Sequence, residues 1–113
     1  MAERSNKQPE IDKIIHERTR LLILSYLAAG EVSRVSFTEL KEKLELTAGN
    51  LSVHLRNLED AGYVKISKRI VGRKPATSVI ITTEGMTALN KYLAEMERLI
   101  NQVKSSGDTE GGV

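Results

Sequence analysis

The chain has 113 residues, of which 40% are hydrophobic, and its formal net charge is +2 at pH 7. This length and composition are typical of one globular domain with a modest core. The absence of cysteine excludes disulfides, thiolate metal sites and a cysteine nucleophile, and it fits a reducing compartment. Because no apolar run is long enough for a membrane span and no signal-peptide core is found, we expect a cytoplasmic protein with no membrane partner.

Both ends of the chain differ from the middle. Residues 1–9 and 105–113 are polar, so we expect disordered tails on either side of a single domain at 10–104. Acidic residues are relatively frequent in these ends, which leaves the domain itself more basic than the whole chain. This is a weak indication of an anionic partner.

A helical pattern of apolar residues begins near Ile11. A break at residues 16–17 would leave a short helix before a longer one, and Gly30 is typical of a helix C-terminus. Residues 31–35 form a connection that has room for a short strand. The inward-facing positions of the longer helix are Leu21, Leu24, Leu27 and Ala28.

The stretch SFTEL predicts the start of the next helix, over residues 37–44. Ser36 can accept a hydrogen bond from the backbone N–H of Glu39, and the Glu39 carboxylate can reach back to Ser36. The residues expected to face the core are Phe37, Leu40 and Leu44. A tight joint at Glu45–Leu46 follows.

The helix predicted over residues 47–61 is capped by Thr47 and ended by Gly62. Its core stripe is Leu51, Leu55 and Leu58. The other side carries Gly49, Ser52, Val53, Arg56 and Asn57, with Asn50 at its edge. Because small and polar residues of this kind stabilise a helix poorly, we interpret this face as one that another molecule approaches closely. The alternative is an ordinary solvated helix face.

Residues 63–71 and 76–82 are rich in Val, Ile and Thr, which favours two strands, and GRKP at 72–75 predicts the turn between them. The cations of this hairpin, with no acidic residue between Val64 and Pro75, are Lys65, Lys68, Arg69, Arg73 and Lys74. They are suited to phosphate contacts, and Arg73 at the tip is suited to a narrow minor groove. The alternative is that the charges protect an exposed strand edge from aggregation.

The last helix is expected to start at Thr82, with Glu84 in its first turn, and to run to about Lys104. A heptad seam of Met86, Leu89, Leu93, Met96, Ile100 and Val103 is widened by Ala88, Tyr92 and Leu99. Because a small domain cannot bury both stripes, we expect a homodimer. The candidate dimer interface comprises Ile11, Ile14, Ile15, Leu89, Tyr92, Leu93, Met96, Leu99, Ile100 and Val103. The alternative is that this helix packs within the chain across the hairpin.

The order of elements, with RLLILSYL, FTELKEKLELTAGNLSVHLRNLEDAGYV and GRKPATSVIITTEG, resembles the small winged helix-turn-helix transcription regulators of the MarR/ArsR-like superfamily. The resemblance covers roughly residues 11–104. It implies a mainly α fold with a small β-hairpin (α+β), in which a winged helix-turn-helix is followed by a long C-terminal dimerisation helix. It also implies a recognition helix at 47–61 and a basic wing at 64–82.

The chemistry of the recognition face suits DNA. Asn50, Val53, Arg56 and Asn57 can read base edges, Thr47, Ser52 and His54 can contact phosphate or pack, and the small Ala48 and Gly49 permit close approach. The resemblance implies the same roles. The candidate DNA-binding residues are therefore Ser36, Thr47, Ala48, Gly49, Asn50, Ser52, Val53, His54, Arg56, Asn57, Lys65, Lys68, Arg69, Arg73 and Lys74.

Other function classes fit less well. His16 and His54 lie in different segments without convincing carboxylate partners, so we expect no enzyme, no metal site and no cofactor. A protein-interaction module and a nonspecific, chromatin-like DNA-binding protein remain alternatives to a sequence-specific regulator. A chain without an evident activation segment favours repression. Tyr92 and Met96 could line a small effector pocket, but no residue marks a ligand.

Overall fold

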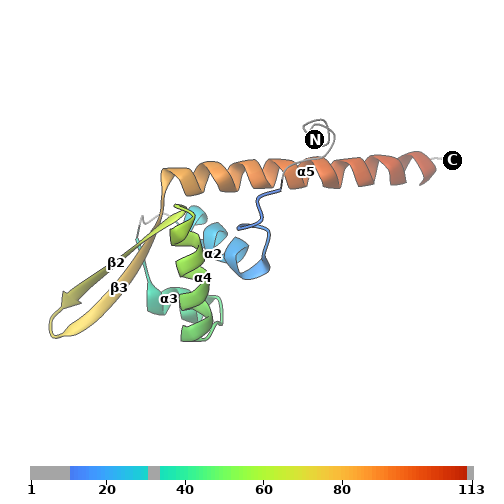
Figure 1. Cartoon of the computed structure of the whole chain (residues 1–113). Coiled ribbons are helices and arrows are strands. Elements are labelled where there is room, and N and C mark those ends of the chain that lie inside the picture. The colour runs from blue at the N-terminus through green and yellow to red at the C-terminus, as the bar shows by residue number, and fades with distance from the viewer. Residues whose placement is uncertain (1–10, 31–33, 112–113) are drawn as a thin grey trace.

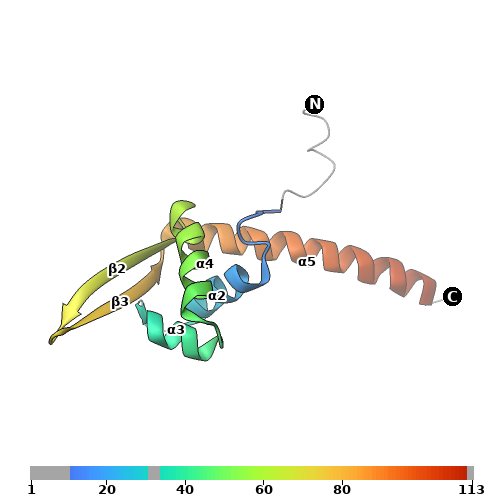
Figure 2. The same cartoon turned by 60° about the horizontal axis from the view of Figure 1, so that its bottom comes forward.

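The structure, a computed structural model, describes residues 11–30 and 34–111 (Figure 1). The elements are α2 (Arg18–Ala29), β1 (Val35–Ser36), α3 (Phe37–Lys43), α4 (Ala48–Asp60), β2 (Val64–Val71), β3 (Lys74–Ile81) and α5 (Thr83–Gly111). The three shorter helices form the body, the β2–β3 hairpin leaves it on one side, and α5 runs along the body and beyond it (Figures 1 and 2). This is the predicted winged-helix architecture. The predicted N-terminal tail lies outside the described residues.

The segment before α2 differs from the predicted short helix, because residues 13–15 form only a turn. The Asp12 carboxylate accepts hydrogen bonds from the backbone N–H groups of Ile14 and Ile15, at 2.8 and 3.1 Å. A side-chain acceptor that holds the backbone in this way competes with helix formation. Ile15 is nevertheless fully buried in the core.

α2 begins after the predicted break, where the Glu17 side chain accepts a hydrogen bond from Arg20 N. It ends at the predicted position, although Gly30 is extended, with φ −73° and ψ 150°, rather than left-handed. Its core positions are Ile23, Leu24 and Leu27. Leu21 and Ala28, which were predicted to face inward, pack against this core and are half-buried.

The joint between α3 and α4 is as tight as predicted. Ser36 Oγ accepts a hydrogen bond from Glu39 N at 3.0 Å, and Thr47 Oγ1 accepts one from Asn50 N at 3.1 Å. Glu45 turns the chain in a left-handed conformation (φ 55°). The predicted return contact of Glu39 is replaced by a 2.6 Å hydrogen bond from the Tyr26 hydroxyl, which ties α3 to α2.

The end of α4 is also as predicted. Gly62 adopts φ +85°, and Tyr63 N donates to Leu58 O at 2.9 Å, which is the hydrogen-bond pattern of a Schellman C-cap. Leu51 and Leu58 are fully buried, and Leu55 is 2% exposed. The stripe predicted for this helix is therefore confirmed as its core face, with Leu40 of α3 buried beside it and Phe37 and Leu44 partly buried.

The three strands form an antiparallel sheet in the order β1-β3-β2. The hairpin turn is shorter than predicted and comprises Gly72, with φ +66°, and Arg73, so that Lys74 and Pro75 belong to β3. Pro75 is tolerated because β1 pairs only with residues 78–79, which leaves one side of β3 unpaired at this position.

α5 starts as predicted, with Thr82 Oγ1 accepting a hydrogen bond from Gly85 N at 2.9 Å. It continues to Gly111, so the predicted end at Lys104 is too early. Extending an existing helix costs much less than nucleating one, so poor helix formers can prolong it. Within the described ranges, no helix is both long and apolar enough to cross a membrane.

Candidate nucleic-acid interface

The N-terminal half of α4 presents an exposed surface. Leu51 and Leu55 fix the helix to the body, and Ser52 and Val53 between them are exposed. Val53 is 60% exposed although it is aliphatic. The exposed residues of this surface, which we call the α4 face, are Thr47, Ala48, Gly49, Asn50, Ser52, Val53 and Arg56. These are predicted site residues that the structure leaves open to a ligand at the positive end of a helix dipole.

Gly49 has no packing role within the described part of the chain. A Cβ added there would meet no atom within 4 Å. Glycine also weakens a helix relative to alanine by about 0.5–1 kcal/mol. The missing side chain therefore leaves room for an approaching molecule at a cost in helix stability.

His54 joins α4 to the body. Arg20 Nη1 donates to His54 Nδ1 at 3.2 Å, while Arg20 Nε donates to the Ile14 carbonyl at 2.6 Å. His54 Nδ1 also lies 3.7 Å from Glu17 Oε1. An ion pair with Glu17 would need a proton on Nδ1, whereas Nδ1 must be unprotonated to accept the hydrogen bond from Arg20. Of the two roles predicted for His54, the geometry supports packing. Asn57, a predicted base reader, is half-buried.

Glu17 completes this cluster. Burial raises the pKa of its carboxyl, but the backbone N–H groups of Arg20 and Thr19 and the nearby positive charge outweigh burial, so the pKa is held below its usual value. The ionised carboxylate caps α2 and keeps Arg20 in position beside His54. The cluster thus holds α4 against the body.

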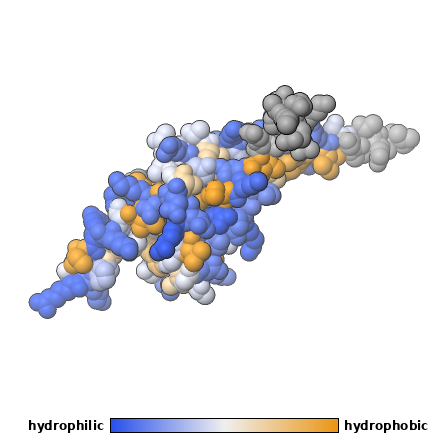
Figure 3. All heavy atoms as spheres, in the orientation of Figure 1, coloured by the Kyte–Doolittle hydropathy of each residue, from blue (hydrophilic) through white to orange (hydrophobic). Residues whose placement is uncertain are grey.

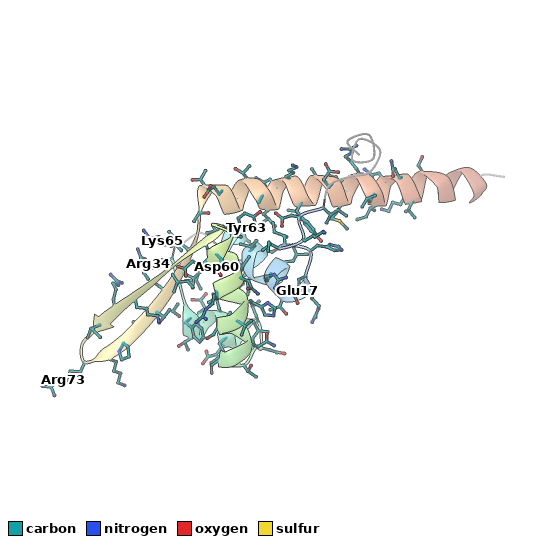
Figure 4. All side chains as sticks on the ribbon, viewed as in Figure 1. Glu17, Arg34, Asp60, Tyr63, Lys65 and Arg73 are labelled. Carbon is teal, nitrogen blue, oxygen red and sulfur yellow. The ribbon has the colours of Figure 1, made fainter. Side chains whose placement is uncertain are left out.

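The hairpin carries cations on both of its faces. Lys65, Lys68, Arg69, Arg73 and Lys74 are all exposed. Arg73 lies at the far end of the hairpin, whereas Lys65 lies near its base, as Figure 4 shows. The structure therefore gathers four of the five predicted cations along the outer part of the hairpin and separates Lys65 from them.

Arg34 was not among the sequence candidates. It immediately precedes β1, and its Nη1 donates to Ser78 Oγ on β3 at 3.2 Å. Arg34 and Lys65 both come from the base of the hairpin (Figure 4). Only the pairing of β1 with β3 brings Arg34 there, so no local signal in the sequence could have identified it. Ser36, a predicted contact, is exposed but is engaged as the cap of α3.

A groove of about 560 Å³ separates α4 from the hairpin. Ser52 and Arg56 border it from α4, and Lys68 borders it from β2. Glu59 also borders the groove and accepts a hydrogen bond from Ile66 N at 3.2 Å. The remaining lining residues are Phe37, Leu55, Ile66 and Thr77. The α4 face and the hairpin therefore border one open, largely positive surface.

A second groove, of about 620 Å³, lies between the N-terminal segment and α5. Its lining residues are Ile11, Asp12, Lys13, Tyr63, Ala88, Lys91 and Tyr92. The Tyr63 hydroxyl donates to Asp12 across this groove, and that hydrogen bond is the main reason that the pKa of Tyr63 is raised to about 12. Asp12, Lys13 and Lys91 make this lining partly charged.

The two histidines lie apart, as His16 Nδ1 contacts the Tyr92 hydroxyl at 2.7 Å and His54 contacts Arg20. In the described part of the chain, no three His, Asp or Glu side chains gather in a way that could hold a metal ion.

The predicted dimer residues fall into three groups, which are buried, exposed and half-buried. Ile15, Leu89 and Tyr92 are at most 5% exposed and belong to the core of the single chain, because the first half of α5 covers the body. Within the single chain they are core residues. Leu93 in the first half of α5 and Ile100 and Val103 in its second half are exposed. Figure 3 shows hydrophobic surface along this helix. Ile11, Ile14, Met96 and Leu99 are half-buried.

The family model described as "Winged helix DNA-binding domain" matches residues 19–100. An uncharacterized protein of Methanocaldococcus jannaschii is 36% identical over 92 residues, which cover 81% of this chain and 98% of that protein. The structure of a transcriptional regulator homologue from Pyrococcus horikoshii OT3 aligns with a TM-score of 0.73 and 34% identity, covering 80% of this chain and 87% of that one. A PadR family transcriptional regulator from Eggerthella lenta shares the fold, with a TM-score of 0.64 and 24% identity over 80% of this chain and 81% of that one.

Proposed function

Because the chain belongs to the winged helix DNA-binding domain family, we propose that it is a homodimeric transcriptional regulator, most simply a cytoplasmic repressor, that binds double-stranded DNA sequence-specifically. The observation that carries this proposal is the common surface of the α4 face and the basic hairpin. Two elements that are distant in the sequence border one open groove, and the hairpin side of it has no acidic residue.

The proposed binding mode follows from the exposed chemistry. The α4 face enters the major groove, where Asn50 and Arg56 hydrogen-bond base edges and Val53 contacts a thymine methyl group. Thr47 and Ser52 contact phosphates at the rim. Asn57, being half-buried, contributes from the edge of this surface.

The hairpin supplies the second contact. Lys68, Arg69, Arg73 and Lys74 lie against the phosphate backbone, and Arg73 reaches furthest from the body. Lys65 and Arg34 lie too near the hairpin base to share that contact and would meet only a more distant phosphate. Most of the binding energy is therefore electrostatic and sensitive to salt.

The second half of α5 provides the dimer contact. Val103 is 72% exposed and Ile100 is 50% exposed on a helix that extends beyond the body. An isolated helix with an apolar stripe is marginally stable in water, and pairing with a second copy would bury that stripe. Two α4 faces in a symmetric dimer would then read a palindromic site.

A fluorescence-anisotropy titration tests this function. The purified chain is titrated into a duplex of its own upstream region and into a random duplex, at 50 and 200 mM salt. We expect at least about a hundredfold preference for the upstream duplex. If the dimer neutralises six to ten phosphates, affinity should fall by roughly 10³–10⁵ between the two salt concentrations.

The other outcomes decide between the alternatives. Equal, salt-sensitive affinity for both duplexes would make the chain a nonspecific DNA-binding protein. Absence of binding to either duplex at 50 mM salt would contradict DNA binding and favour a protein-interaction module.

A further inference from the structure

The far end of the hairpin carries aliphatic side chains that nothing in the described chain covers. Ile70 is 70% exposed and Val71 is 58% exposed. Figure 3 shows hydrophobic surface at this end, bordered by hydrophilic residues. Branched aliphatic residues favour strands, but threonine would serve the strand as well without exposing this much apolar surface.

The strand register assigns these two residues to different faces. Ile70 pairs with Pro75, and Val71 pairs with Lys74. Cross-strand partners share a face and successive residues alternate. Ile70 and Pro75 therefore lie on the same face as Lys68 and Thr77, which line the groove against α4. The face of the hairpin that is turned toward α4 thus ends in an exposed apolar pair.

Positive charge surrounds this pair. Lys68 precedes it on the same face, Arg73 forms the turn, and Lys74 lies on the opposite face. No acidic residue occurs between Val64 and Ile81. This combination matches the minor groove of DNA, whose rims carry phosphates and whose walls are deoxyribose carbons.

We propose that Ile70, supported by Pro75, is an apolar wedge that enters the minor groove next to the major groove occupied by the α4 face. This inference rests on the proposed DNA-binding function. The minor groove is only about 6 Å wide, so the Ile70 side chain enters it and the two-stranded ribbon does not. The fixed φ of Pro75 makes the strand opposite Ile70 rigid.

A wedge of this kind affects the DNA. Apolar side chains that enter the minor groove partly unstack a base step and bend the duplex by roughly 20–90°. Flexible pyrimidine–purine steps such as TA are the easiest to open. The hairpin would therefore add a preference for such a step at a position where no base is read through hydrogen bonds.

The test compares Ile70→Thr with Val71→Thr, its matched control on the other face. A duplex of about 30 base pairs that carries a dye at each end reports affinity by anisotropy and bending by energy transfer. We expect Ile70→Thr to weaken binding about tenfold and to reduce the bend. The slope of affinity against salt should stay unchanged, because no charge is lost. Val71→Thr should change affinity less than about twofold.

Three results would overturn the wedge. Wild-type affinity and bending in Ile70→Thr would contradict it while leaving DNA binding intact. Binding of the wild type to phosphatidylserine vesicles that Ile70→Thr abolishes, with DNA affinity unaffected, would assign the apolar end to a membrane surface. Absence of DNA binding by the wild type would refute both the wedge and the proposed function. Equal melting temperatures of the two variants control for folding.

Discussion

Gly85 lies against the backbone of Tyr63, and a Cβ placed on Gly85 would stand 2.2 Å from the Tyr63 carbonyl oxygen. The same Cβ would lie 2.9 Å from Ile81 Cγ1. This contact brings the first turn of α5 against the end of α4 and the base of the hairpin. Because the Tyr63 backbone cannot move aside as a flexible side chain could, the packing requires glycine at position 85.

We therefore expect Gly85→Ala to destabilise the chain by about 1–3 kcal/mol or more, as overpacked sites do. Urea denaturation followed by circular dichroism measures the change. Stability equal to the wild type would show that α5 can shift away from Tyr63 at no cost.

Gly49→Ala is the matched substitution on the α4 face, where the added Cβ meets open space. Replacing glycine in a helix should raise stability by about 0.5–1 kcal/mol. If the missing side chain serves DNA approach, affinity for the preferred duplex should nevertheless fall. A variant that gains stability and keeps full affinity would show that Gly49 is a solvent-exposed helix position with no role in DNA binding.

The two ends of the hairpin should differ in their contribution to DNA binding. Arg73→Gln should reduce the magnitude of the slope of log affinity against log salt by about one for each phosphate contact that is lost. Lys65→Gln removes the same charge near the hairpin base and should leave the slope nearly unchanged (Figure 4). Titrations from 50 to 200 mM salt measure both slopes. Equal effects would mean that long-range charge, not position, determines binding.

The exposed stripe on α5 predicts a dimer that one substitution can separate. Val103→Glu places a charge in the stripe, whereas Gln102→Glu adds the same charge to another side of the helix. Sedimentation at micromolar concentration should show a dimer for the wild type and Gln102→Glu and a monomer for Val103→Glu. A monomeric wild type would contradict the proposed dimer contact through the second half of α5.

The hydrogen bond from Tyr63 to Asp12 predicts a loss of stability at alkaline pH. The pKa of Tyr63 is raised from 10.0 to about 12, mainly by Asp12 and also by burial. A group with a raised folded pKa stabilises fully below its unfolded pKa, and this contribution is lost as pH rises from about 10 to 12. Tyr63→Phe should therefore be less stable than the wild type near pH 8, and the difference should shrink above pH 10. A difference that does not change with pH would contradict the assignment.

Local signals explain why α4 could be predicted from the sequence. Thr47, Gly62 and the leucines between them act within a few residues of one another, so its ends and its buried stripe follow from spacing alone. The Ser36 cap and the left-handed joint at Glu45 are local in the same sense.

Contacts between distant segments could not be predicted in this way. The burial of Leu89 and Tyr92 depends on how the N-terminal segment passes beneath α5, which spacing does not determine. The Arg20–His54 contact depends on the angle between α2 and α4. The hairpin was predicted as a single basic cluster, but its register gives it a base, a tip and two different faces.

A dimethyl sulfate footprint on a duplex selected by the wild-type protein from a random pool tests the central claim most directly. This reagent methylates guanine N7 in the major groove and adenine N3 in the minor groove. We predict protection of guanine N7 in two half-sites about ten base pairs apart, with adenine N3 protection at the flanks where the hairpins lie. Arg56→Ala should lose guanine protection and keep the flanking signal. Bound DNA whose guanines and adenines all remain reactive would contradict the assignment of the α4 face and the hairpin to the two grooves.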